Sequence, residues 1–233
     1  MRMLVVGATG YVGRHLVQAA LDAGHEVLAH VRPDSASGDR TAVALAATGA
    51  RVVRTPWTID AWHRLLNIET PDRMFLLLGT TAARARRAAQ AGAPEATQQS
   101  VDLALTMIAM NAARIASPAT GLVYLSSLGA SMTGNEYLRV RATVEAALAS
   151  VPNPFTVVRP SVITGPDRGE ARPVERLGAL AVNATGVLLR AFGAQRRAAK
   201  WASISGKELA EILVALASQP LDRRVHELDD FRH

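Results

Sequence analysis

A glycine turn near the start of the chain constrains its fold most strongly. Gly7, Gly10 and Gly13 follow the apolar run Met3–Val6 and precede a stretch of helical composition from Arg14. A strand, a glycine turn and a helix in this order open dinucleotide-binding α/β folds, in which the backbone approaches a pyrophosphate and the helix N-terminus faces it. The turn therefore predicts a dinucleotide site formed by Gly7, Thr9, Gly10, Tyr11, Val12 and Gly13.

Composition narrows the class of protein. A chain of 233 residues with 49% hydrophobic residues can bury a full core, so we expect a single domain over 1–233. The absence of cysteine excludes disulfides and thiolate chemistry, and the histidines have no metal-ligand spacing. The net charge of +6 comes mostly from scattered arginines, and no nucleic-acid motif accompanies them. With no leader at the N-terminus and no membrane span, we expect a cytoplasmic protein that binds neither nucleic acid nor membrane.

Apolar runs and helical patterns alternate along the rest of the chain. We expect a doubly wound parallel sheet, the Rossmann α/β fold, with a small C-terminal elaboration in which 160–233 contributes a substrate-side loop and helices. The expected strands after Met3–Val6 are His25–Arg32, Ala50–Arg54, Arg73–Leu78, Gly121–Leu125, Phe155–Arg159 and Arg224–Leu228. The expected helices are Arg14–Leu21, Thr41–Ala47, Thr58–Leu66, Glu95–Ala116, Glu136–Ala149, Val174–Leu189 and Gly206–Val214, and Asp229–His233 is expected to be a frayed tail.

The end of the second strand indicates which cofactor is preferred. NAD sites carry a carboxylate there for the ribose 2′-hydroxyl, whereas this chain has Arg32, whose guanidinium would pair with a 2′-phosphate. We therefore expect NADP(H) in preference to NAD(H). Arg32 could instead be a solvated loop residue, and Asp34 or Asp39 could reach the ribose. Trp57, after the third strand, could stack on adenine, although a buried or half-buried tryptophan is the simpler interpretation.

The end of the fourth strand should run beside the cofactor. In a doubly wound sheet the ligand lies where the strand order reverses, at the carboxyl ends of the strands. We therefore expect Leu78, Gly79 and Thr80 to contact the cofactor, with Gly79 allowing a close approach. The following stretch, 82–94, is interpreted equally well as a flap over the site or as a solvated loop.

A serine, a tyrosine and an arginine could form the catalytic group. Ser126 and Ser127 follow the fifth strand, Tyr137 comes ten residues after Ser127, and Arg141 lies four residues further on the same helical face. Hydride transfer to a carbonyl needs a proton, which a tyrosine hydroxyl supplies when a cation stabilises the phenolate, while a serine orients the carbonyl. Arg141 would also hold the nicotinamide ribose. Alternatively, Tyr137 and Arg141 only pack the helix and hold cofactor.

These motifs resemble an atypical group of short-chain dehydrogenase/reductases that includes the Tat-interacting oxidoreductase and many bacterial relatives. The resemblance implies that Val162, Ile163 and Arg168 lie near the nicotinamide. The chain departs from the family's Tyr-x-x-x-Lys pattern, because the residue four positions after Tyr137 is arginine. It rests on the glycine turn, Leu78–Thr81, Val101–Asp102, Ser126–Ala130, Tyr137, Arg159–Ser161 and the segment Arg168–Arg176.

Two functions follow as hypotheses. The first is an NADPH-dependent oxidoreductase acting on a small carbonyl or quinone-like substrate, with Tyr137 as the proton donor. The second is a catalytically weak NADP(H)-binding redox sensor that works through a protein partner, and it is motivated by the arginine at position 141. The sequence names neither the substrate nor the oligomeric state.

Overall fold

Short apolar runs form the strands of one parallel sheet in the computed structural model, which describes residues 1–33, 38–79, 99–165 and 203–231. The central runs are buried on both faces, as expected when helices cover both sides of a parallel sheet. The seven strands lie in the order β3-β2-β1-β4-β5-β6-β9. They are β1 (Arg2–Val6), β2 (Glu26–His30), β3 (Arg51–Val53), β4 (Arg73–Leu76), β5 (Gly121–Leu125), β6 (Phe155–Arg159) and β9 (Val225–Glu227).

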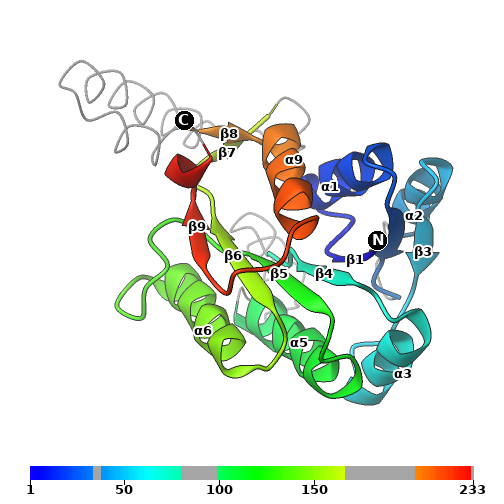
Figure 1. The fold of residues 1–233 in the computed structure, drawn as a ribbon, viewed down its shortest axis with the longest axis horizontal. Coiled ribbons are helices and arrows are strands. Elements are labelled where there is room, and N and C mark those ends of the chain that lie inside the picture. The colour runs from blue at the N-terminus through cyan, green and yellow to red at the C-terminus, as the bar shows by residue number, and fades with distance from the viewer. Residues whose placement is uncertain (34–37, 80–98, 166–202, 232–233) are drawn as a thin grey trace, which may run out of the picture.

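Helices cover the two faces of this sheet, which confirms the doubly wound α/β fold. Figure 1 shows α1 and α9 on one face and α3, α5 and α6 on the other, and the buried clusters follow the same division, with α2 on the side of α1. The helices are α1 (Tyr11–Asp22), α2 (Gly38–Ala47), α3 (Ile59–Glu69), the π-helix η1 (Gln99–Ala104), α5 (Leu105–Ala116), α6 (Glu136–Ser150), α9 (Gly206–Ala217) and the 3₁₀ helix η2 (Leu228–Asp230).

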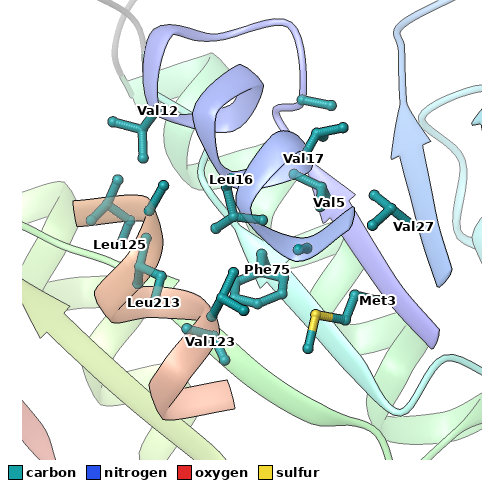
Figure 2. Close-up of a cluster of buried hydrophobic side chains, with 14 of the residues drawn as sticks. Met3, Val5, Val12, Leu16, Val17, Val27, Phe75, Val123, Leu125 and Leu213 are labelled. Atoms are coloured by element: carbon teal, nitrogen blue, oxygen red, sulfur yellow. The ribbon is translucent and has the colours of Figure 1, made fainter. Parts of the chain in front are cut away.

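The core on the α1 side joins segments that are far apart in the chain. In Figure 2, Phe75 of β4 lies among side chains from β1, α1, β5 and α9, including Leu16, Val123 and Leu213. Each of these four side chains is fully buried. Burying an aliphatic or aromatic side chain of this size contributes about 1.5–3 kcal/mol, so this layer fixes α1 against the sheet.

The reversal of strand order locates the expected ligand crevice. β1 pairs with β2 on one side and with β4 on the other, and all these pairings are parallel. The chain then continues outward through β5, β6 and β9. The glycine turn after β1 and the residues after β4 therefore lie side by side at the carboxyl edge of the sheet, where doubly wound folds bind ligands.

Helix ends follow the local capping residues. Gly24, with φ of +77°, follows the end of α1, and glycine adopts this left-handed conformation without steric cost. The side chain of Thr58 caps α3 by accepting a hydrogen bond from the N–H of Ala61, and Ser205 caps α9 by accepting one from Glu208. Within the described part of the chain, no helix is long and apolar enough to cross a membrane.

Some sequence predictions need correction. The expected helix Glu95–Ala116 begins, in its described part, with η1, and Val174–Leu189 lies outside the described residues. A second, two-stranded sheet formed by β7 (Ile163–Thr164) and β8 (Ile204–Ser205) was not predicted. The frayed tail is wrong for Asp230, because η2 has a capping box in which the side chain of Asp230 accepts a hydrogen bond from the N–H of Glu227.

Candidate active site

The glycine turn has no room for side chains at the positions that the sequence singled out. Gly7 has φ of +98°, and a Cβ atom there would lie 3.1 Å from the carbonyl carbon and oxygen of Leu77. A Cβ atom on Gly13 would lie 2.1 Å from the carbonyl oxygen of Gly7, inside contact distance. Gly10 donates its N–H to the carbonyl oxygen of Gly7 at 2.9 Å and forms the N-cap of α1. The tight turn and the close approach of α1 thus need glycine.

The N-terminus of α1 fits a pyrophosphate. Thr9 and Gly10 are exposed at the tip of the turn, Gly10 offers no capping side chain, and the first turn of α1 contains no acidic residue. The N–H groups of a first helical turn lack intrahelical partners and carry the positive end of the helix dipole. This arrangement suits an anion and would hold the phosphates of a dinucleotide.

Two predicted cofactor contacts of the turn use their side chains for packing. The hydroxyl of Tyr11 donates to the carbonyl oxygen of Thr164 at 3.1 Å, and its ring lies where a Cβ atom on Gly165 or Gly206 would be. Val12 belongs to the buried cluster on the α1 side. A cofactor at this turn would therefore contact the main chain of Tyr11 and Val12 and not their side chains.

The adenosine end of the crevice combines a buried imidazole with a half-buried arginine. Arg32 follows β2, and its charge contributes to the lowered pKa of His30. Burial is the main cause, and together these effects lower the pKa of His30 from 6.5 to about 4, so that the ring is neutral at neutral pH. Asp39 pairs with Arg54 at 2.5 Å, with its side chain 89% exposed, and Asp34 lies outside the described residues.

Trp57 stacks on a neighbouring tryptophan in the structure. Its ring centroid lies 4.9 Å from that of Trp62 with an interplanar angle of 27°, and His30 completes the cluster at 5.0 Å from Trp57 and 4.9 Å from Trp62. Trp57 is half-buried, which confirms the packing interpretation of this residue.

Arg141 lies beneath the ends of β4 and β5. Its Nη1 donates to the carbonyl oxygens of Leu78 at 3.0 Å and Leu125 at 3.3 Å, and to the hydroxyl of Tyr124 at 3.2 Å. Its Nη2 donates to Oδ2 of Asp102 at 3.1 Å. The guanidinium thereby links the segment after β4, the end of β5 and the π-helix η1.

The charge of Arg141 is buried together with its counter-charge. The side chains of Arg141 and Asp102 are 6% and 0% exposed. Desolvation opposes the charge on Arg141, but attraction to Tyr124, Tyr137 and Asp102 outweighs it and raises the pKa of the guanidinium. Burial also raises the pKa of Tyr124 to about 12, an effect that Arg141 only partly offsets. The ribose clamp expected of Arg141 stays a prediction, because its described bonds all go to protein groups.

Gly79 separates this guanidinium from the crevice. Gly79 is exposed, and a Cβ atom built on it would lie 3.0 Å from Nη2 of Arg141. Leu78 is buried beside it, and Thr80 lies outside the described residues. The cofactor contact expected at Gly79 stays a prediction, and the structure places the guanidinium of Arg141 next to this residue.

Tyr137 is the reactive-group candidate that the geometry brings to this edge. It lies in the first turn of α6, where the side chain of Asn135 caps the helix by accepting from the N–H of Leu138 at 3.0 Å. The predicted shared face with Arg141 is confirmed, because the guanidinium carbon lies 5.0 Å from the centroid of the Tyr137 ring. Tyr137 is half-buried, with its ring against the guanidinium of Arg141.

The two serines after β5 have different environments. Ser126 is 3% exposed, and its hydroxyl donates to Oε1 of Glu145 at 2.5 Å. Glu145 also accepts from Arg159 through both carboxylate oxygens, at 2.9 and 2.5 Å. Ser127 is half-buried and makes only a long contact of 3.4 Å with the carbonyl oxygen of Leu128. The geometry therefore favours Ser127 over Ser126 for orienting a substrate.

The remaining predictions concern the side of the crevice near β7. Val162 is half-buried, and its carbonyl oxygen accepts from the N–H of Ile204 at 3.0 Å, whereas Arg168 lies outside the described residues. Within the described ranges, no group of three histidine, aspartate or glutamate residues could hold a metal ion.

Sequence reasoning missed three residues of this site. Asp102 was noted only as part of a motif, Tyr124 was placed in a buried strand without its hydroxyl being considered, and Glu145 was an ordinary helix residue. Glu145 follows Arg141 by four residues and so lies on the same helical face, which was the one local signal available. The other two meet Arg141 only through long-range packing.

Comparison with known proteins gives one family and several distant relatives. A family model described as the NAD dependent epimerase/dehydratase family matches residues 3–218. A 56-residue stretch is 43% identical to phenylcoumaran benzylic ether reductase PT1 from Pinus taeda and covers 22% of this chain and 18% of that protein. The chain thus spans about a fifth of the length of this curated relative.

Two solved structures share the fold over nearly the whole chain. A Bacillus halodurans protein described as an NAD-dependent epimerase/dehydratase has a TM-score of 0.66 and 18% identity, covering 97% of this chain and 92% of its own. The NADPH-dependent 3-quinuclidinone reductase from Rhodotorula rubra has a TM-score of 0.63 and 16% identity, covering 96% and 88%. The glycine turn, the strand order and the family match together show that the chain belongs to the NAD dependent epimerase/dehydratase family.

Proposed function

We propose that this protein is an NADPH-dependent reductase of a small carbonyl or quinone-like compound. The observation that carries the proposal is the cradle after β1: the turn excludes a Cβ atom at Gly7 and Gly13 and presents an uncapped helix N-terminus at the edge where Tyr137 also lies. Gly7, Gly10 and Gly13 would hold the pyrophosphate. When bound, the reduced nicotinamide supplies a hydride.

Tyr137 supplies the proton in this proposal. The developing alkoxide of a reduced carbonyl takes the proton of the Tyr137 hydroxyl, while the hydroxyl of Ser127 holds the carbonyl oxygen in place. Arg141 packs against the tyrosine ring with its guanidinium carbon 5.0 Å from the centroid, and it fixes the ends of β4 and β5. This contact sets the orientation of the ring without consuming its hydroxyl.

Arg32 selects NADPH in this proposal. It is half-buried just after β2, where a guanidinium would bind a 2′-phosphate, and the carboxylate of Asp39 forms an exposed ion pair with Arg54. The Rhodotorula rubra neighbour is an NADPH-dependent reductase, and the Pinus taeda relative is a reductase. As part of the same proposal, we assign the chain to the group of short-chain dehydrogenase/reductases that includes the Tat-interacting oxidoreductase.

The test is a titration with NADPH and NADH, followed by oxidation of NADPH against quinones, aldehydes and ketones. We expect tighter binding of NADPH and turnover on at least one class. Tight binding without turnover would favour the sensor hypothesis instead, and no binding of either nucleotide would overturn the cofactor assignment.

Two variants separate the roles. Tyr137→Phe should lower kcat by at least about 100-fold, within the range for general acid catalysis, with the Kd for NADPH within about twofold of the wild type.

Arg32→Ala should weaken NADPH binding at least about tenfold and leave NADH binding unchanged, since only NADPH carries the 2′-phosphate. Arg64→Ala, an exposed arginine of α3, is the matched control and should change neither Kd. Equal losses for both nucleotides in Arg32→Ala would contradict the assigned selectivity.

A further inference from the structure

The buried pair of Asp102 and Arg141 has no part in the proton transfer described above, yet it lies at the edge of the sheet where that chemistry would occur. Its side chains are 0% and 6% exposed, and the other arginine–carboxylate pairs of the described residues are more exposed than this one. Taking two charges out of water costs several kcal/mol per ion, which the pairing and the further hydrogen bonds must offset. Because the Asp102–Arg141 pair is costly to bury and lies at this edge of the sheet, it suggests a functional role.

The position of the pair defines what its charge can reach. Nη1 of Arg141 donates hydrogen bonds to the carbonyl oxygens of Leu78, two residues after β4, and of Leu125, the last residue of β5, and Nη2 lies 3.0 Å from the place of a Cβ atom on Gly79. The exposed residue Gly79 is therefore next to the guanidinium at the carboxyl edge of the sheet. In a doubly wound sheet the crevice at this edge holds the reacting end of the cofactor.

The net charge of the floor matters because the nicotinamide ring changes charge in the reaction. The oxidised ring is cationic and the reduced ring is neutral, so a charge beneath it stabilises one form relative to the other. Arg141 and Asp102 together carry no net charge, and the tyrosines that touch the guanidinium, Tyr124 and Tyr137, are neutral when protonated. Within the pair, each charge therefore offsets the effect of the other on the two redox forms.

We propose that Asp102 is a positioning residue that sets the relative affinity for oxidised and reduced cofactor by neutralising Arg141 beneath the nicotinamide. The inference rests on the proposed binding of NADP(H). Without the carboxylate, the guanidinium would repel the oxidised ring; without the guanidinium, the carboxylate would attract it. The two single substitutions should consequently shift the selectivity in opposite directions.

The experiment measures the Kd values of NADPH and NADP⁺ by calorimetry for the wild type, Asp102→Asn, Arg141→Gln and the double variant. Unit charges about 10 Å apart at an effective dielectric constant of about 20–40 change the ratio Kd(NADP⁺)/Kd(NADPH) roughly four- to fifteenfold. We expect Asp102→Asn to raise this ratio, Arg141→Gln to lower it, and the double variant to return it to the wild-type value.

The ratio is chosen because it cancels effects that act on both nucleotides. A lost ribose contact or a smaller folded fraction changes both Kd values alike, since the two forms share ribose, pyrophosphate and adenosine. Glu69→Gln is the matched control, because it removes a carboxylate paired with Arg51 at the opposite end of the strands, where it also accompanies Arg2. It changes the net charge by the same amount and should leave the ratio unchanged.

The outcomes test the proposed function and the role of Asp102 separately. If the wild type binds neither nucleotide, the proposed function fails. If the wild type binds both and the single variants keep its ratio, or both shift it in the same direction, the role of Asp102 is overturned. Should one single variant not fold, as circular dichroism would report, the other alone tests the sign.

Discussion

Acidification should unfold this protein partly through one buried histidine. His30 is 2% exposed at the end of β2, it packs against the stacked rings of Trp57 and Trp62, and its Nε2 is 3.3 Å from the carbonyl oxygen of Thr55. Burial lowers its pKa from 6.5 to about 4. Charging the ring in the folded state is therefore more costly than charging it in the unfolded chain.

The sign and size follow from linkage. A folded pKa below the unfolded one contributes stability that is complete above pH 6.5 and is lost as the pH falls toward 4. The full difference is about 3 kcal/mol at 1.36 kcal/mol per pKa unit. At pH 5 the unfolded state is favoured by a factor of about 30 relative to pH 7.5, which is a loss of about 2 kcal/mol.

The assay is urea unfolding at pH 7.5 and pH 5 for the wild type and His30→Phe, which keeps an aromatic ring against the two tryptophans. The chain has six histidines and many carboxylates, so both proteins will depend on pH, and the informative quantity is the difference between them. The free energy of unfolding of the wild type should fall by about 2 kcal/mol more than that of the variant. An equal fall in both would refute the reasoning.

Further predictions concern the turn, the serines and a helix cap. Gly13→Ala should abolish NADPH binding in calorimetry, because its Cβ atom would lie 2.1 Å from the carbonyl oxygen of Gly7; wild-type affinity would contradict the tight-turn geometry. Ser127→Ala should lower kcat at least about tenfold, whereas Ser126→Ala should mainly lower the melting temperature; the reverse pattern in paired kinetic and thermal assays would exchange their roles. Thr58→Ala should cost about 1 kcal/mol in urea unfolding, and no loss would show that the cap is dispensable.

Local patterns in the sequence predicted most of the fold. The strands Gly121–Leu125 and Phe155–Arg159 have the predicted bounds, since a run of apolar residues between turn residues becomes a buried strand wherever it docks. The stop at Gly24 and the cap at Ser205 also depend on neighbouring residues alone. Local patterns do not predict the pair β7–β8, because each strand is two residues long and the paired residues are 41 positions apart.

The candidate site, like the fold, could be predicted from the sequence only in part. Spacing alone placed Tyr137 and Arg141 on one helical face and put glycines where the turn after β1 has no space for a Cβ atom. Tertiary structure decided what Arg141 contacts: Asp102, 39 residues away, and Leu78, 63 residues away. Helical geometry fixes which residues share a face within a few turns, whereas the partner of a buried charge is set by how distant elements pack, and no local spacing encodes that choice.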